Sequence, residues 1–415
     1  MRSLTAAVLL LGFVAFPRPG AGFSVLAHQA VVDGAWDDSI APELRRRFPG
    51  ATPGDFEKAR AFAYGGSHIA DLGYFPLGNR LFTDLLHYVR SGDFIVALLE
   101  SAKKPDEYAF ALGAAAHYIT DSTGHPEATN RAVAVIYPKL RQKHGDTVTY
   151  ADDHGAHMTT EFRFDVLQMS RSTGSPDLYG HSLGFQVSER VLDEAFQKTY
   201  GLRLDDLFAS TDTAIETYRF AFRTLIHEVT GIAWELYRAD IEKLDVKATP
   251  ATFVSDVTRT DFEREFGKTY REPGYFAKFV AFLVKLIPNI GPLRRTGYKP
   301  LPPDVQTLFT EALDHATARY RETVAHVHTR RPELPNLNLD TGLPTRRNEY
   351  QPTDEAYVSL LEKLEERDFA GVPRTMRDDF HRFFEEGGDG TGTTADSARV
   401  RLALARLDRI PDTGR

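Results

Sequence analysis

Residues 107–125 read EYAFALGAAAHYITDSTGH, and this stretch indicates how the chain is organised. Its first part, EYAFALGAAA, is almost entirely apolar or small, as expected for a helix in a protein core. The run leads directly into His117, Asp121 and His125, which follow one another at intervals of four residues. Residues at this spacing lie on one face of a helix, about 5–6 Å apart at Cβ. The stretch therefore predicts a core helix that carries three polar, metal-capable side chains on one face.

The same helical periodicity recurs through most of the chain before residue 245. Apolar residues are spaced by three and four in TTEFRFDVLQMS, ERVLDEAFQKTY and TAIETYRFAFRTLIHEVTGIAWELYRADIEKL, and strand-like alternation is nearly absent. Segments rich in Gly, Pro, Asp and Ser, such as RRFPGATPGD, separate the helical stretches. We therefore expect an all-α fold, with a multi-helix bundle and a metal-binding cleft formed by residues 23–244.

The character of the sequence changes after residue 244. An apolar segment, YFAKFVAFLVKLIPNIGPL, precedes the helical pattern PPDVQTLFTEALDHATARYRETVAHVH, a loop rich in Pro and Asn, and two further helical stretches. We interpret residues 245–415 as a helical C-terminal extension, either packed on the first part or forming a small domain. Residues 276–287 are more typical of a core helix than of a helix at a membrane surface, although peripheral membrane contact stays open.

The composition excludes several kinds of site. The 415 residues are 42% hydrophobic and 26% charged, which is typical of a globular protein. The net charge of −8 provides no basic surface for nucleic acid, so we expect no stable nucleic-acid partner. The chain has no cysteine, which excludes disulfides and thiolate metal sites. Any metal must be bound by His, Asp, Glu or main-chain groups. The sequence does not indicate an oligomeric state.

The N-terminus has the order of a secretory signal peptide. One arginine precedes an apolar run from about residue 4 to residue 16, and small residues follow in PGAG. A buried N-terminal helix is the alternative, but the prolines and glycine directly after the run would break it. We therefore expect residues 1–22 to be a signal peptide, cleavage to expose Phe23, and the protein to be secreted or periplasmic.

Further His, Asp and Glu residues lie on both sides of HYITDSTGH. His28, Asp71 and His87 precede it, and His157 and Glu161 follow it with the same four-residue spacing. A single His/Asp pair at this spacing is weak evidence, because a buried His–Asp hydrogen bond explains it equally well. The recurrence of the pattern favours a metal site to which each pair contributes two ligands.

The order of these residues resembles the zinc-dependent phospholipase C family, whose fold is shared with S1/P1 nucleases. The resemblance covers about residues 23–161, extends more loosely to residue 244, and implies an all-α cleft that binds up to three zinc ions. It implies three ligand groups: a first group of Asp71, His87, His117 and Asp121; a second group of Asp121, His28 and the free amino group and carbonyl of Phe23; and a third group of His125, His157 and Glu161.

The resemblance also implies roles in catalysis and in substrate binding. Asp71 is expected to act both as a ligand and as the acceptor of a proton from the attacking water. Tyr74, Phe75 and Tyr88 lie next to expected ligands in the sequence. Such aromatic rings could enclose a quaternary ammonium headgroup, stack on nucleobases, or simply pack in the core.

Three functions from different classes are compatible with the sequence. We expect a secreted zinc-dependent phosphodiester hydrolase, a phospholipase C that attacks phospholipid headgroups through a zinc-bound hydroxide. The alternatives are a nuclease of the S1/P1 kind and a non-catalytic, metal-free binding protein on the same scaffold. The acidic net charge favours a lipid headgroup over a nucleic acid as the phosphodiester substrate.

Overall fold

The protein is built from α-helices in the part that the structure, a computed structural model, describes. The described residues are 23–75, 77–171, 185–244, 248–249, 253, 300–328, 334–386 and 394–410, so the predicted signal peptide and residues 276–287 lie outside them. The α-helices are α2 (Val25–Ala35), α3 (Ala41–Arg47), α4 (Pro53–Ile69), α5 (Arg80–Tyr88), α6 (Ser91–Ser101), α7 (Pro105–Gly124), α8 (Asn130–Ile136), α9 (Pro138–His144), α10 (His154–Arg171), α12 (Glu189–Tyr200), α13 (Thr211–Leu244), α17 (Pro303–His326), α18 (Gln351–Glu365), α19 (Arg374–Glu386) and α20 (Thr394–Leu407).

Short segments of tighter or wider helix connect several of these elements. They are the π-helices η2 (Trp36–Ile40) and η4 (His125–Thr129) and the 3₁₀-helices η3 (Ala70–Tyr74) and η5 (Leu204–Asp206). The described ranges contain no strand, and one isolated bridge joins Leu337 to Pro344. The predicted all-α fold is therefore confirmed.

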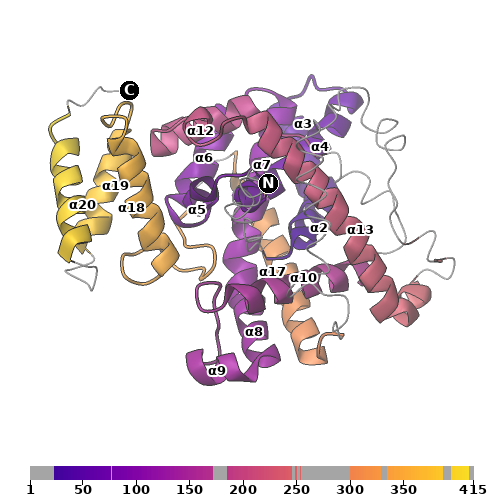
Figure 1. Ribbon diagram of the computed structural model, residues 1–415. Helices are drawn as coiled ribbons and strands as arrows, with labels where there is room; N and C mark the ends of the chain where they lie inside the picture. Colours follow the sequence, from indigo (N-terminus) through magenta and orange to yellow (C-terminus); the bar gives the residue numbers. More distant parts are fainter. Residues whose placement is uncertain are drawn as a thin grey trace, which may run out of the picture.

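Helix α7 forms the centre of the bundle (Figure 1). Every residue from Glu107 to Gly124 is buried, and α4, α6, α2 and α17 all pack against this helix. Its N-terminus is fixed by Glu107, whose carboxylate accepts hydrogen bonds from the main-chain N–H groups of Lys103 and Lys104 at 2.8 and 3.2 Å. Arg190 donates two further hydrogen bonds to the same carboxylate. The apolar stretch before His117 is thus a core helix, as predicted.

Two glycines allow α4 to lie unusually close to α7. A Cβ atom on Gly113 would lie 1.9 Å from the carbonyl oxygen of Ala63, and one on Gly66 would lie 1.9 Å from that of Phe110. Only a residue without a side chain fits where two helix backbones approach this closely. The close contact continues along both helices and brings the end of α4 beside His117, where Ser67 contributes a main-chain oxygen to the site.

The start of the described chain is anchored inside the bundle. Asp165 on α10 accepts hydrogen bonds from the Ser24 hydroxyl at 2.6 Å and from the Leu26 amide at 2.8 Å. These contacts fix the first turn of α2, where Ser24 adopts a left-handed conformation with φ 62°. The ring of Phe23 is fully buried and packs edge-on against Phe164 at 5.9 Å. Phe23 therefore occupies a defined position next to the core.

The C-terminal extension is helical, and its first described helix is part of the bundle. Helix α17 packs on α7 and α2, and its Tyr320 hydroxyl donates to the carbonyl of Leu112 at 2.9 Å. Helices α18, α19 and α20 lie together at one side of the protein (Figure 1), where the rings of Tyr357 and Phe383 stack at 3.6 Å. The extension is thus packed on the first part through α17, and its division from residues 23–244 as a separate unit stays a prediction.

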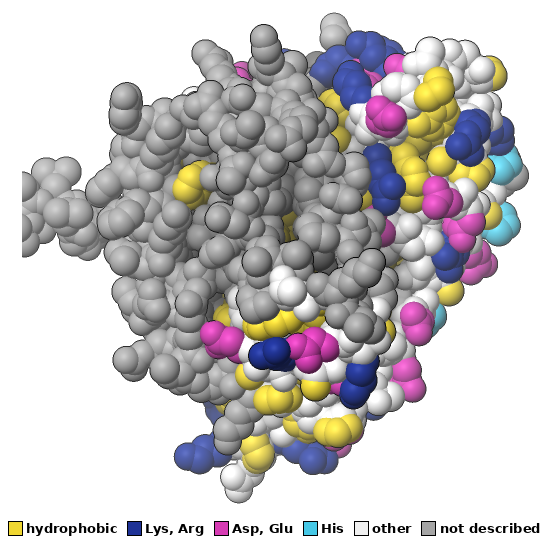
Figure 2. Space-filling view, turned by 90° about the vertical axis from the view of Figure 1, so that its right-hand side faces the viewer, with side chains coloured by type: hydrophobic (Ala, Val, Ile, Leu, Met, Phe, Trp, Pro, Cys, Tyr) yellow, Lys and Arg dark blue, Asp and Glu magenta, His cyan; other side chains and the backbone are white. Residues whose placement is uncertain are grey.

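The described helices and one face of the surface bear on the predicted peripheral membrane contact. Of the described helices, none is long and apolar enough to cross a membrane. On the face in Figure 2, the described Lys and Arg side chains lie among Asp and Glu side chains, with hydrophobic side chains between them. This described surface has no patch of a single charge that would indicate an anionic membrane. Peripheral membrane contact stays a prediction.

Candidate metal centre

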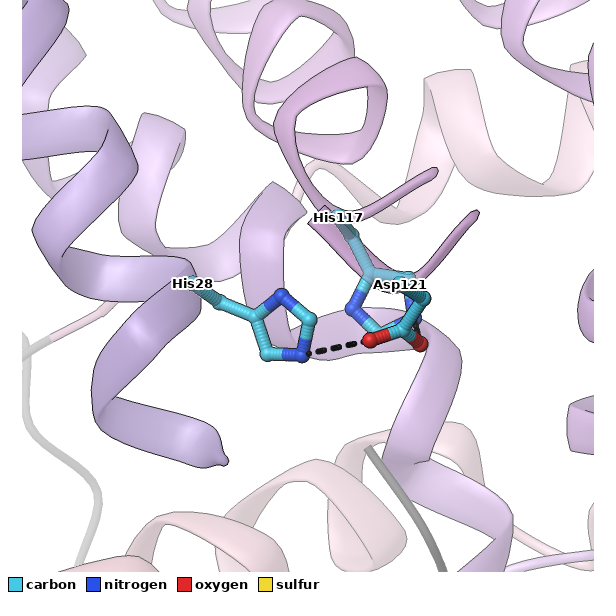
Figure 3. Close-up of side chains that lie close together, drawn as sticks. All are labelled: His28, His117 and Asp121. Atoms are coloured by element: carbon cyan, nitrogen blue, oxygen red, sulfur yellow. Dashed lines mark ion pairs between the residues drawn. The ribbon is translucent and has the colours of Figure 1, made fainter. Parts of the chain in front are cut away.

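Asp121 lies where the predicted ligands converge. Its Oδ2 atom lies 3.1 Å from His117 Nε2 and 3.4 Å from His87 Nε2. Its Oδ1 atom lies 3.2 Å from His28 Nε2 and 2.9 Å from the main-chain nitrogen of Phe23. In Figure 3 the rings of His28 and His117 point toward this carboxylate from two different helices, α2 and α7. The two oxygens of one carboxylate therefore face two different sets of nitrogen donors.

Main-chain oxygens determine which nitrogen of His87 and His117 faces this centre. His117 Nδ1 donates a hydrogen bond to the carbonyl of Ser67 at 3.0 Å, and His87 Nδ1 donates to the carbonyl of Thr83 at 2.9 Å. A carbonyl only accepts, so in a neutral ring the proton must sit on Nδ1 and the Nε2 lone pair is free. The two Nε2 atoms lie 3.4 Å apart. Two lone pairs directed at the same point favour a positive charge between them, either a proton or a metal ion.

Asp71 completes the first group. Helix η3 carries it, and its Oδ1 atom lies 3.5 Å from His87 Nε2. Asp71, His87 and His117 each bring one donor atom within 4.8 Å of the others, and all three residues are buried. The structure therefore brings together all four residues of the first group.

The third group lies one turn further along the chain from Asp121. The main-chain N–H of His125 donates to the Asp121 carbonyl at the end of α7, and its Nε2 lies 3.5 Å from Asp121 Oδ1 and 3.9 Å from Glu161 Oε1. On α10, His157 Nδ1 lies 2.8 Å from Glu161 Oε1. His157 Nε2 donates to the amide oxygen of Asn130 at 3.0 Å, which leaves Nδ1 free. His125, His157 and Glu161 form a buried set within 4.8 Å.

The donor spacing fits zinc. With bond lengths of about 2.0–2.1 Å, two ligands of a tetrahedral zinc ion lie about 3.3 Å apart. The distances between neighbouring donor atoms in the first and second groups run from 2.9 to 3.5 Å. Both ring nitrogens of His28 and of His125, and both oxygens of Asp71, have no hydrogen-bond partner among the described residues. Buried polar atoms are normally satisfied, so this many unpaired donors and acceptors indicates bound metal.

The charges of the site are compatible with a bound cation. Burial and then the neighbouring carboxylates raise the pKa of Glu161 well above its ordinary value, and burial raises the pKa of Asp71 despite the nearby imidazoles. Burial disfavours the charge on Asp121 too, but His117 and His28 outweigh it and hold its pKa well below 3.8. Burial lowers the pKa of His117, and the Asp121 carboxylate outweighs it and raises the pKa to about 9. A divalent ion would supply the positive charge that these protons now provide.

Comparison with known proteins agrees with this arrangement. Residues 27–209 match the sequence model of a family described as zinc dependent phospholipase C. This region, which is less than half of the chain, is therefore similar to the zinc-dependent phospholipase C family. No curated protein and no solved structure matches the chain. The matched region contains all the predicted ligands except Phe23.

The similarity to the zinc-dependent phospholipase C family and the site geometry agree on the metal. The family is zinc-dependent, and three buried sets of side chains each bring donor atoms within 4.8 Å. Both findings support zinc as the metal and a phospholipase C-like hydrolase as the activity. The number of ions, and the role of each residue as a ligand, stay predictions.

The predicted aromatic residues of this phospholipase C-like region have different surroundings. The ring of Tyr74 lies 5.9 Å from that of His87, and its hydroxyl has no hydrogen-bond partner among the described residues. Phe75 packs on Tyr218 at 4.2 Å, and the hydroxyl of the fully buried Tyr88 donates to Asp340 at 2.8 Å. Their assignment to substrate binding stays a prediction.

Other polar residues near the predicted ligands have structural contacts of their own. His68 is fully buried and packs against the rings of Phe185 and Phe222. His154 lies against the ring of Tyr150 at 4.2 Å. Asp152 accepts hydrogen bonds from Thr149 at 2.8 Å in an exposed turn. His157 rather than His154 therefore joins Glu161, as the spacing predicts.

Several residues that shape the site were not found from the sequence. They are the main-chain oxygens of Ser67 and Thr83, the amide of Asn130, and the carboxylates of Asp165 and Asp340. Asn130 lies shortly after HYITDSTGH in the sequence, so it could have been considered as a hydrogen-bond partner of a ligand histidine. The main-chain oxygens that orient the ligands cannot be identified from the sequence, because every residue has a main-chain oxygen.

Proposed function

We propose that the protein is a secreted zinc-dependent phosphodiester hydrolase, and that it acts as a phospholipase C on phospholipid headgroups. The observation that carries this proposal is the position of Asp121. Its Oδ1 faces His28 and the Phe23 nitrogen, and its Oδ2 faces His87 and His117. A carboxylate that bridges two metal positions is suited to hydrolysis of a phosphodiester, where attacking and leaving oxygens both need a cation.

The chain's own residues supply ligands, orientation and a proton acceptor. Bound zinc would supply an activated water and positive charge for the phosphate. Asp71 has two oxygens without hydrogen-bond partners, so one can bind metal while the other accepts a proton. The carbonyls of Ser67 and Thr83 keep the two imidazoles oriented throughout.

Among the predicted aromatic residues, Tyr74 is the best candidate for a contact with substrate. Its unpaired hydroxyl is a donor close to the first group, whereas the Tyr88 hydroxyl is used by Asp340 and Phe75 packs on Tyr218. The guanidinium of Arg80 lies 5.1 Å from the Tyr74 ring and pairs with Asp84 at 2.7 Å, so only part of its charge is available to an anionic headgroup. These contacts support a phosphodiester with a polar headgroup as substrate.

The test combines metal analysis with two substrates. We expect the mature protein to contain zinc, to release phosphorylated headgroups from phospholipid in mixed micelles, and to lose this activity on chelation until zinc is added back. Single-stranded DNA is the second substrate, and release of acid-soluble nucleotides without headgroup release would identify a nuclease instead. A folded protein with almost no metal, whose melting temperature a chelator does not change, would exclude both enzymes.

A second prediction concerns the N-terminus. In the chain described here the Phe23 nitrogen is an amide that donates to Asp121 at 2.9 Å. Cleavage before Phe23 would convert it into an amino group whose lone pair can bind metal. We expect a mature protein that begins at Phe23 to bind one more zinc ion per chain than a variant with one extra residue before Phe23. The extra residue should lower activity by about tenfold or more, because even the outer partners of ligands contribute that much.

The control keeps the amino group and changes only the side chain. A mature Phe23→Leu variant retains the N-terminal amine and main-chain carbonyl, so it should bind as many zinc ions as the native mature protein. Metal per chain is measured by mass spectrometry after removal of loosely bound ions. Equal zinc content with and without the extra residue would show that the N-terminus is not a ligand.

A further inference from the structure

A segment of the C-terminal extension lies across the metal centre. This segment, residues 334–345, which we call the strap, lies far outside the region that matches the family. It is bound to helices α5, α6 and α7 by hydrogen bonds: Leu339 N to His87 O at 3.0 Å, Tyr118 hydroxyl to Pro335 O at 2.6 Å, Ser91 hydroxyl to Leu337 O at 2.7 Å, and Thr345 hydroxyl to Tyr88 O at 3.1 Å. The strap is therefore an integral part of the structure around the ligands.

One glycine lets the strap approach the end of α7 closely. Gly342 has φ +68°, and a Cβ atom there would lie 2.7 Å from the carbonyl oxygen of Ser122. Ser122 directly follows Asp121 in the chain. Both the left-handed conformation and the short distance require a residue without a side chain. The strap is thus held against the turn that carries Asp121 and His125.

The strap places a buried carboxylate next to the third group. Asp340 is fully buried, and its Oδ2 accepts hydrogen bonds from the hydroxyls of Tyr88 at 2.8 Å and Tyr350 at 2.6 Å. Its Oδ1 has no hydrogen-bond partner among the described residues and lies 3.7 Å from the equally unpaired Nδ1 of His125, just beyond hydrogen-bonding distance. The two tyrosines hold the carboxylate so that its free oxygen faces the imidazole edge opposite the expected metal.

The strap also contacts His157, the second histidine of the third group, through the side chain of Asn130. Asn130 donates to the main-chain oxygen of Asp340 at 2.8 Å, which orients its amide oxygen toward His157 Nε2. In the first group, main-chain carbonyls within the matched region, residues 27–209, orient the rings of His87 and His117. In the third group, both histidines face the strap: His125 lies 3.7 Å from Asp340, and His157 is linked to it through Asn130.

We propose that Asp340 is a positioning residue for the third group, whose carboxylate accepts the Nδ1 proton of His125 and keeps Nε2 directed at the metal. This inference rests on the proposed function. A carboxylate behind a ligating histidine fixes the ring and its tautomer and strengthens metal binding. Occupancy of the third group therefore depends on the C-terminal extension, which the family region alone does not contain.

The test is Asp340→Asn, with zinc binding as the readout. In this variant both tyrosine hydroxyls donate to the one amide oxygen, so the NH₂ group faces His125 Nδ1. An NH₂ group only donates, so it would place the imidazole proton on Nε2, the atom that should bind the metal. We expect two of three zinc ions to bind as in the native protein and the third to bind about 10–100-fold more weakly. Affinities are measured by titration of zinc alone against a competing chelator, and high zinc should restore the third ion.

The control is Asp379→Asn, which makes the same change at a similar site away from the metals. Asp379 is a buried carboxylate of the extension that accepts a hydrogen bond from the Tyr357 hydroxyl at 2.8 Å. Zinc affinities should stay native in this variant. If Asp340→Asn does not fold, Tyr350→Phe, which removes one of the two hydroxyls that hold Asp340, should weaken the third ion severalfold.

The possible results separate this inference from the proposed function. Three ions bound with native affinity by Asp340→Asn, or by Tyr350→Phe where only that variant folds, would overturn the positioning role and leave the hydrolase intact. Absence of zinc from the native mature protein would overturn both. Weakening of all three ions to the same extent would show a general loss of structure and would also overturn the specific role of Asp340.

Discussion

Replacement of Asp121 by asparagine is expected to remove zinc from the first and second groups and to lower phosphodiesterase activity by at least about a hundredfold. Both oxygens of the native carboxylate are used, one toward His28 and one toward His117. An amide has a single oxygen, so its NH₂ group must face one of these imidazoles and would repel a metal there. The amide also lacks the negative charge that offsets the ions.

Zinc content and headgroup release measure this effect independently of each other. Asp106→Asn is the matched control, because Asp106 lies in the first turn of the same helix, pairs with Lys58 near the surface, and contacts no predicted ligand among the described residues. The control should keep native zinc content and activity. If Asp121→Asn bound three zinc ions, or if Asp106→Asn lost as much activity, the bridging role of Asp121 would be wrong.

Much of this site could be predicted because its ligands follow helical geometry. His117, Asp121 and His125 lie on one face of α7 as their spacing indicates, and the His157–Glu161 pair does the same on α10. The interval from Asp121 to His125 keeps α-helical geometry, since the His125 N–H donates to the Asp121 carbonyl, and the π-helical turn that follows was not suggested by the sequence. Local spacing thus identified which side chains meet, whereas the contacts that orient them came from the structure.

The contribution of the C-terminal extension could not be predicted in the same way. Asp340 lies in a loop rich in Pro and Asn, which has no periodicity to indicate which residue faces the core. Its partner Tyr88 is 252 residues away in sequence. A contact at that separation is set by how α17 and the strap pack on α7, and no local pattern encodes such packing. The helices of the extension were predicted, but its contact with the metal centre was not.

The small residues of α7 show a similar limit. The sequence indicated a buried helix at EYAFALGAAA, and the structure confirms it. The sequence alone does not explain why this helix contains Gly113, since glycine has poor helix propensity. The reason is the backbone of α4, whose Ala63 carbonyl occupies the space that a side chain would need. A residue that weakens its own helix here permits the contact that orients His117.

Replacement of Gly113 by alanine is therefore expected to destabilise the protein by about 3 kcal/mol, at the upper end for overpacked cores. The new Cβ would lie 1.9 Å from the Ala63 carbonyl oxygen, which cannot move without the rest of α4. Separation of the helices by more than an ångström would also stretch the hydrogen bond from His117 Nδ1 to Ser67, now 3.0 Å long. Zinc affinity at the first group should fall together with stability, by about tenfold.

Gly231→Ala is the control, because a Cβ on this glycine in helix α13 would meet no atom within 4 Å. Alanine there should stabilise the protein by about 0.5–1 kcal/mol, the ordinary gain for a helix interior, and leave zinc affinity unchanged. Thermal unfolding and zinc titration of both variants provide the comparison. A Gly113→Ala protein that unfolds at the native temperature with native zinc affinity would show that the close contact of α4 with α7 does not orient His117. Loss of stability with unchanged affinity would separate the two effects and assign the glycine to packing alone.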